Sequence, residues 1–428
     1  MGLNVMSHLA AKSAYRSLEE RINRLPQGAP PSETLYKILS LLFSEQEAAL
    51  VAQLPIRPFT ARAASKLWGM PLAQAETMLQ RLASRAILLD VEQNGVQTYT
   101  LPPPMAGFFE FSMMRTRHDI DQKLLAELYY QYLNVEEDFI KDLFLGSETR
   151  LGRVFVREQV LSNELAIHVL DFERASHFIQ TTPQVAVSVC YCRHKMEHLG
   201  RACDAPQDIC LTFGNTAASL AKHGYARLID SHEGMELLYQ AYDHDLVQCG
   251  ENVRQNVSFI CNCCSCCCEG LTAVRKFGAL QPIHTTNYLA SVTDNCIGCG
   301  RCAAKCPALA IEVSQVEPGE ARRRAQVKTD ICLGCGICVR HCPQNSVVLE
   351  RREQRVITPV NSVHRLVLMA IEKGKLHDLL VNNQALASHR AMAAVLSTIL
   401  KLSPVKQAMA SQQLKSVYLD RLLERLLS

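Results

Sequence analysis

The sequence has little of what would mark a membrane protein, a secreted protein or a nucleic-acid-binding protein. Its 428 residues carry a net charge of only +3, too small for this length to indicate nucleic acid or an anionic membrane as a partner. No apolar run approaches the roughly 18 to 20 residues of a membrane span. The first residues contain no secretory signal, and Met6 breaks the myristoylation pattern. These absences predict a cytoplasmic protein.

Nucleotide-binding glycine motifs are also missing. No G-x-G-x-x-G follows an apolar strand, and FGNTAAS at residues 213–219 has too few glycines to cradle a pyrophosphate. A flavin or nicotinamide is therefore expected on another protein. The length predicts two to four domains, because a single hydrophobic core stops growing below this size.

Cysteine is the residue that the chain has in excess. Nineteen cysteines are present, and a reducing compartment favours metal or redox roles for them over structural disulfides. The stretch CNCCSCCC at residues 261–268 places six of them in eight positions. Adjacent cysteines cannot bridge one another without strain, so metal binding and reactive thiols remain as their roles.

Two cysteine runs in the C-terminal third repeat one pattern. CIGCGRCAAKCP begins at residue 296 and CLGCGICVRHCP at residue 332, and each is a C-x2-C-x2-C-x3-C-P run. Bacterial ferredoxins with two [4Fe-4S] clusters have this spacing, and the fourth cysteine of each run binds the other cluster. The predicted ligands are Cys296, Cys299, Cys302 and Cys342 for one cluster, and Cys332, Cys335, Cys338 and Cys306 for the second. A zinc ribbon would leave the third and fourth cysteines of each run unexplained.

Glycines within these runs are predicted to let the backbone come close to the cluster sulfurs, so that backbone N–H groups donate hydrogen bonds to them. They are Gly298, Gly300, Gly334 and Gly336. The segment between the runs carries Arg322, Arg323 and Arg324. These arginines predict either a solvated loop or a basic rim that meets an acidic redox partner.

The remaining eleven cysteines all lie between residues 190 and 268. VAVSVCYC and NVSFICNCC each read as a short apolar strand that delivers thiols to the loop at its end, so at least one more iron–sulfur centre is predicted. The candidate ligands are Cys190, Cys192, Cys203, Cys210, Cys261, Cys263, Cys264, Cys266, Cys267 and Cys268. Cys249, alone in LVQCGEN, is predicted to be a buried or surface thiol rather than a ligand.

The number of candidate ligands suffices for two cubanes or for one cluster of unusual nuclearity, so one or two additional clusters are expected. Arg193, His194 and Lys195 directly follow the first two thiols. They are predicted to form a surface charge run. The alternative is that they lie beside a cluster, where positive charge raises its potential and lowers thiol pKa values.

The order of these motifs resembles a family of large iron–sulfur proteins from anaerobic metabolism. CYCRH at residues 190–194, a later pair of cysteines, the CNCC block with its triple cysteine and the two ferredoxin runs follow one another. The resemblance covers residues 171–350. It implies an iron–sulfur architecture with a two-cluster ferredoxin domain.

An α+β multidomain fold is predicted. Residues 30–104 contain helices followed by a hairpin at Asn94-Gly95, an order that resembles a winged helix. The longest of these helices has only Arg81 and Arg85 as basic contacts, which disfavours DNA as a partner and favours protein docking.

The predicted domain boundaries follow from these features and from three prolines at 102–104, which predict a linker. The domains are N-terminal helices with a winged-helix-like domain at 1–104, a helical connector at 105–170, an α/β cysteine-rich iron–sulfur domain at 171–288, a two-[4Fe-4S] ferredoxin domain at 289–355 and a helical C-terminal tail at 356–428. The tail is predicted to pack on the body or on a second subunit in a homo-oligomer. Peripheral membrane contact is the alternative.

Taken together, the motifs predict an iron–sulfur electron-transfer protein that relays single electrons between a redox partner and a further iron–sulfur site in a larger oxidoreductase system. A flavoprotein is one candidate for the partner. Two alternatives remain open. One is an oxidoreductase with a substrate-accessible cluster built from the cysteines at 190–268, and the other is a redox-sensing DNA-binding regulator.

Overall fold

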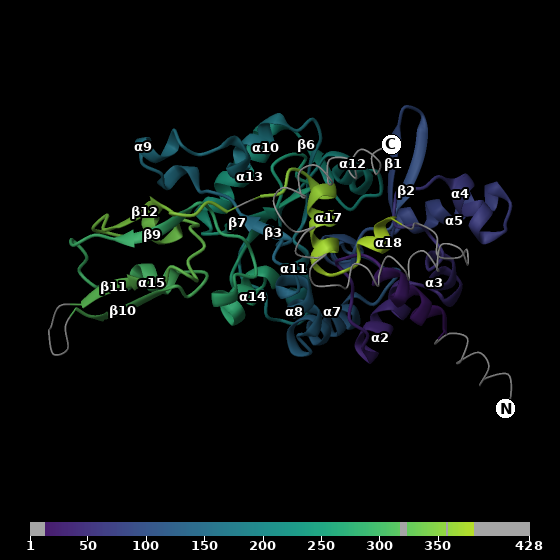
Figure 1. Cartoon of the computed structure of the whole chain (residues 1–428), viewed down its shortest axis with the longest axis horizontal. Helices are drawn as coiled ribbons and strands as arrows, with labels where there is room; N and C mark the ends of the chain where they lie inside the picture. The colour runs from purple at the N-terminus through teal and green to yellow at the C-terminus, as the bar shows by residue number, and fades with distance from the viewer. Residues whose placement is uncertain (1–12, 317–322, 357, 381–428) are drawn as a thin grey trace.

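The structure is a computed structural model of the chain that describes residues 13–316, 323–356 and 358–380. The N-terminal helices lie at one end of the molecule, two small sheets from the C-terminal third lie at the other, and the largest sheet lies between them (Figure 1). Helices and several separate sheets make up a mixed α+β chain, which confirms the predicted class at that level.

The N-terminal region has the predicted order of helices followed by a hairpin. Residues 13–22 are helical, and α2 (Glu33–Leu42), α3 (Glu45–Val51), α4 (Ala61–Trp68), α5 (Leu72–Ser84), β1 (Leu89–Gln93) and β2 (Val96–Thr100) follow. Side chains of Ser32, Ser44 and Thr60 cap three of these helices by accepting backbone N–H bonds. Gly69 ends α4 at a φ of 62°, which glycine adopts without strain.

The arginine in α5 and the arginine at its C-terminal end are paired within the chain. Arg81 and Arg85 both form ion pairs with Glu47 on α3, at 3.0 and 2.9 Å. The hairpin is engaged as well, because the buried Asp90 accepts a hydrogen bond from Ser219 of the cysteine-rich region at 2.8 Å. The contact between Asp90 and Ser219 joins the N-terminal region to the cysteine-rich region.

The connector is mainly helical, as predicted, and then adds a strand. Its elements are an irregular turn (Pro104–Phe108), α6 (Phe109–Phe111), α7 (Gln122–Tyr130), α8 (Asp138–Leu145), β3 (Gly152–Val154) and α9 (Asn163–Ala166). Phe109 packs in the core with its ring centroid 5.2 Å from that of Tyr129. Pro102 and Pro104 are buried, so these prolines belong to the core and the predicted linker is wrong.

One six-stranded antiparallel sheet forms the centre of the cysteine-rich region, which corrects the predicted α/β class. The strand order is β3, β7 (Val247–Glu251), β8 (Phe259–Cys263), β5 (Asp208–Phe213), β4 (Val185–Val189) and β6 (Arg227–Ile229). Every neighbouring pair runs in opposite directions, so the helices form no crossovers between adjacent parallel strands. Because β3 comes from the predicted connector, the sheet begins before residue 171.

One face of this sheet is apolar and covered by helices. The helices of the region are α10 (Ala175–Thr181), α11 (Tyr191–His198), α12 (Gly214–Lys222), α13 (Ser231–Asp243) and α14 (Glu269–Phe277). Leu211 and Ile260 share a core with Phe178 of α10 and with residues of α13. Because side chains alternate along a strand, the neighbouring Cys210 and Cys261 point to the opposite face.

The ferredoxin module contains two short antiparallel sheets and two short helices. β9 (Tyr288–Val292) pairs with β12 (Val347–Arg351), β10 (Ile311–Gln315) pairs with β11 (Arg323–Val327), and the helices are α15 (Arg301–Lys305) and α16 (Ile337–Arg340). The module docks on the turn between α13 and β7. There Asp245 pairs with Lys305 at 3.0 Å and with His341 at 2.7 Å.

The C-terminal tail begins with α17 (Ser362–Glu372) and α18 (Leu376–Leu380). α17 packs on the body, where Leu368 and Ile371 join Leu25 in a small core and Arg365 pairs with Glu251 at 2.8 Å. Residues 381–428, which carry most of the predicted membrane or partner contact, lie outside the described residues. Among the helices of the described ranges, none has the length and apolar character to cross a membrane.

Candidate metal centres

The first ferredoxin cysteine set lines a small cavity of its own. Its thiols are Cys296, Cys299, Cys302 and, from the other run, Cys342. The backbone N–H groups of Gly298 and Ala325 lie 3.5 Å from Cys296 Sγ, as expected of donors to a cluster ligand. Cys299 is exposed, so this site faces solvent.

The second set lines a separate cavity, and its thiols are more buried than those of the first set. Its thiols are Cys332, Cys335, Cys338 and, from the first run, Cys306. The N–H of Ala310 lies 3.2 Å from Cys306 Sγ, and that of Ala290 lies 3.5 Å from Cys332 Sγ. Burial raises the pKa of Cys335 to about 12. Each cavity is therefore lined by three cysteines of one run and the fourth cysteine of the other run, the grouping that the sequence predicts for the ligands.

Glycine is required at two positions of these loops by both conformation and space. Gly298 and Gly334 have φ values of 65° and 68°, which other residues rarely adopt. A Cβ at Gly298 would lie 2.5 Å from the Arg323 carbonyl oxygen, and one at Gly334 would lie 2.1 Å from the Tyr288 carbonyl oxygen. Gly300 and Gly336 are also at positive φ. The loops thus fit the close backbone approach that a cluster requires.

Strand directions bring the cysteines between residues 190 and 268 to one edge of the large sheet. β4 and β8 are both antiparallel to β5, so they end at the edge where β5 and β7 begin. Cys249 on β7 lies opposite Cys261 on β8, and Cys210 lies on β5. Cys261 and Cys263 belong to β8 itself rather than to the predicted loop, so the pleat points both to the same face.

A cavity of about 140 Å³ lies against this face, whereas the two ferredoxin cavities measure about 20 and 10 Å³. Six thiols that line it form a closed series in which each thiol shifts the pKa of its neighbours, and we call this series the thiol ring. Their order is Cys190, Cys192, Cys268, Cys263, Cys261 and Cys210. Thiols spread around a space in this way suit a cluster of several irons better than a single ion.

Two helices begin at thiols of the ring. Cys190 is the N-cap of α11 and Cys268 is the N-cap of α14. The N-terminus of a helix carries partial positive charge and stabilises a thiolate there. The neighbouring Cys192 thiol is the largest cause that holds the pKa of Cys190 and of Cys268 well below its usual value. These two thiols thus favour the thiolate form that binds metal, whereas neighbouring thiols raise the pKa of Cys192, Cys210 and Cys263.

Arg193, His194 and Lys195 are buried, so the predicted surface charge run is wrong. α11 packs against α6 and α7 as well as the thiols, which encloses its charged residues. Arg193 donates to the Asn262 carbonyl at 3.2 Å and lies 3.6 Å from Cys264 Sγ. Burial alone would lower the pKa of Arg193, and the neighbouring thiolates raise it above its usual value instead.

Apolar side chains also line the cavity beside the thiols, and the sequence does not predict them. They include Met105, Phe111, Met114, Phe144 and Ile283, which we call the apolar wall. Glu110 also lines the cavity, and burial followed by the negative charge of Cys261 raises the pKa of its carboxyl group to about 8. The stretch PPPMAGFFEF predicts only a linker at its prolines, because nothing local in it shows that this segment lies against cysteines far along the chain.

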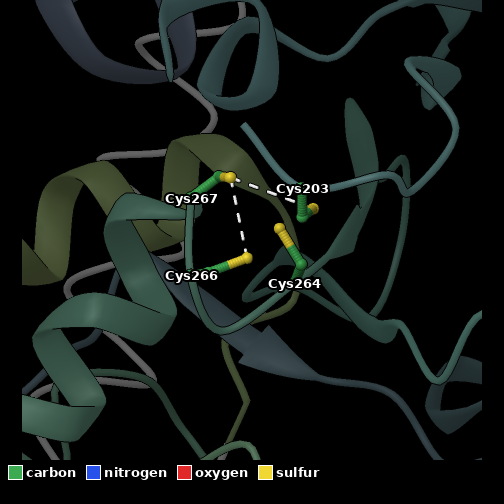
Figure 2. A group of neighbouring side chains, drawn as sticks. All are labelled: Cys203, Cys264, Cys266 and Cys267. Atoms are coloured by element: carbon green, nitrogen blue, oxygen red, sulfur yellow. Dashed lines mark hydrogen bonds between the residues drawn. The ribbon is translucent and has the colours of Figure 1, made fainter. Parts of the chain in front are cut away.

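The remaining four candidate ligands lie together beside the thiol ring. Cys203, from the loop between α11 and β5, meets Cys264, Cys266 and Cys267 from the loop before α14 (Figure 2). Cys264 also lines the large cavity. We call these residues the four-thiol group.

Cys249 lines the large cavity although the sequence sets it apart from the ligands. Its thiol contacts Cys263 but is not a member of the ring. We expect Cys249→Ser to leave the iron content unchanged and Cys263→Ser to remove about four irons. Iron and acid-labile sulfide per chain, measured after anaerobic purification, check this. Equal losses in the two variants would make Cys249 a ligand.

Comparison with known proteins identifies one part of the chain. Residues 295–346 match the family described as 4Fe-4S dicluster domain. Neither the curated proteins nor the solved structures contain a match to the chain. The family match and the grouped cysteines show that this is an iron–sulfur protein with a ferredoxin-type [4Fe-4S] domain.

Proposed function

We propose that the ferredoxin module relays single electrons between an external redox protein and a further iron–sulfur centre held by the thiol ring. The observation that carries the proposal is the arrangement of three thiol-lined cavities in one chain, two in the module and one on the large sheet. Bound iron–sulfur clusters supply one-electron redox chemistry. The chain's own residues determine which sites are exposed to solvent and which groups offset the negative charge of the thiolates.

The first ferredoxin site is suited to exchange electrons with a partner protein. Cys299 is exposed and the neighbouring Ile297 is 60% exposed, so a partner can approach closely. Arg323 at the start of β11 is also exposed, whereas Arg324 pairs with Asp294 at 3.0 Å. Arg322 lies outside the described residues. A protein with an acidic face, such as a flavoprotein, fits this surface.

The second ferredoxin site faces the cysteine-rich region. A Cβ at Gly336 would lie 2.5 Å from Val160 Cγ2, so the cluster loop touches the segment between β3 and α9. Buried Arg157 from the same segment donates to the carbonyl groups of Tyr242 and Leu246, both at 3.1 Å. Leu246 leads directly into β7 and packs near Cys264. This contact offers a short path from the module to the thiols.

The thiol ring lies beside positively charged groups and beside apolar side chains. The N-termini of α11 and α14 and the guanidinium of Arg193 offset the negative charge of thiolates and of an added electron. The apolar wall, most of which comes from the connector, lowers the polarity around the cavity. Such surroundings tune the reduction potential of a bound centre.

The test is iron and sulfide per chain, with spin-counted electron paramagnetic resonance of the dithionite-reduced protein. We expect about 12 irons or more in the wild type. In Cys190→Ser/Cys261→Ser we expect the iron above about eight to be lost while the ferredoxin signals persist. A wild type with only about eight irons, all of them in ferredoxin clusters, would exclude the further centre and with it this function.

A second candidate function is reduction of a substrate at the thiol-ring centre. The apolar wall and the larger volume of the cavity favour it, because they leave room for a small apolar substrate beside the cysteines. A small apolar ligand that shifts the spectrum of the reduced centre, but not those of the ferredoxin clusters, would support this candidate.

A further inference from the structure

The four-thiol group converges on a single point. Its sulfur atoms all lie within 4.8 Å of one another, and Cys267 Sγ lies 3.7 Å from Cys266 Sγ and 3.9 Å from Cys203 Sγ (Figure 2). A tetrahedral zinc ion with Zn–S bonds of about 2.3 Å places its sulfurs about 3.8 Å apart. The observed spacing therefore matches four ligands of one ion.

The other thiols of the chain are arranged differently. No other group of three or more cysteine, histidine or acidic side chains within the described ranges comes this close together, although those ranges contain all eight ferredoxin cysteines. Ligands of a cubane must stand apart to leave room for four irons and four sulfides. The thiol ring likewise surrounds a cavity. The short distances between its sulfur atoms thus distinguish the four-thiol group from every cluster site described above.

We propose that Cys203, Cys264, Cys266 and Cys267 bind one divalent, thiolate-preferring metal ion, zinc or iron, in a closed tetrahedral site. Four sulfur ligands in a tetrahedron are typical of both ions, and a site with four protein ligands and no open position is structural. Four thiolates around a divalent ion leave an excess negative charge. The buried Arg193, 3.6 Å from Cys264 Sγ, offsets part of it.

The ion would fix the loop that supplies the thiol ring. Cys264 directly follows Cys263, and Cys267 directly precedes Cys268, so the loop between them passes through the four-thiol group and returns to the ring. Cys203 ties this loop to the segment between α11 and β5. One metal ion would therefore hold in place the backbone on both sides of the cavity.

The test uses the full chain purified without oxygen and the double variant Cys203→Ser/Cys266→Ser, with Cys249→Ser as the matched control. We expect the double variant to lose about one zinc or one iron per chain, with sulfide and the ferredoxin signals unchanged. The control should keep its metal. Elemental analysis distinguishes zinc from iron.

Two results would overturn the proposal: loss of several irons together with sulfide, which would mean a cluster, or no loss of metal. If the double variant does not fold, Cys266→Ser alone decides the question, because the Cys266 thiol is exposed. It should release its ion to a chelator faster than Cys249→Ser, and equal release would count against the site. The result does not depend on the thiol-ring centre, whose own variant carries different cysteines.

Discussion

Replacing Lys195 with methionine is expected to lower the free energy of unfolding by about 3–5 kcal/mol. The Lys195 ammonium forms an ion pair with Glu269 in which the two side chains are only 1% and 4% exposed. Asn134 completes the network by accepting from Lys195 at 2.9 Å and donating to Glu269 at 2.7 Å. Methionine would leave the Glu269 carboxylate buried without its counter-charge, which is the costly outcome for a buried pair.

The position of this pair gives the substitution a second expected effect. Lys195 lies on α11 and Glu269 on α14, the two helices that begin at Cys190 and Cys268. Loosening them should also lower the occupancy of the thiol ring.

Urea unfolding of anaerobic protein, followed by circular dichroism, measures the change in stability. Lys195→Met/Glu269→Leu should recover most of the loss, because an apolar pair of similar volume replaces the charges. The matched control is Arg227→Met, which breaks the exposed ion pair with Glu233 and should cost no more than about 1 kcal/mol. A loss for Lys195→Met as small as that of the control would show that the buried pair contributes little.

Replacing Cys302 with alanine is expected to remove about four irons and one of the two ferredoxin signals. Cys302 lines the same cavity as Cys342, which is 40 positions later in the sequence and belongs to the other run. Cys342→Ala should therefore remove the same cluster as Cys302→Ala. Cys306→Ala should instead remove the cluster of the other cavity, which Cys332, Cys335 and Cys338 line.

Electron paramagnetic resonance of the reduced variants distinguishes the two clusters. In the wild type the two reduced clusters should interact magnetically, and each single variant should show one isolated cluster. The controls are the variants of the opposite set, since Cys338→Ala should give the same spectrum as Cys306→Ala. Matching spectra for Cys302→Ala and Cys306→Ala would contradict the exchange of the fourth ligands.

The two groups of ferredoxin cysteines that line the cavities could be predicted because their spacing is local in the sequence. Three cysteines at positions i, i+3 and i+6, followed by a fourth before proline, wrap one cluster loop whatever the rest of the chain does. The required glycines are equally local, since Gly298 and Gly334 meet the backbone of their own module. The capped helices and the hairpin of the N-terminal region are predictable for the same reason.

The sequence by itself therefore determined the iron–sulfur chemistry, the ferredoxin module and the large number of cysteines between residues 190 and 268. Only the tertiary structure decided how those thiols are divided. Cys263 and Cys264 are adjacent in the chain and yet enter different groups, because β8 ends between them and the backbone turns away from the sheet. The burial of Arg193 follows from helices packed around α11. Contacts between distant segments make both features, and no local pattern encodes such contacts.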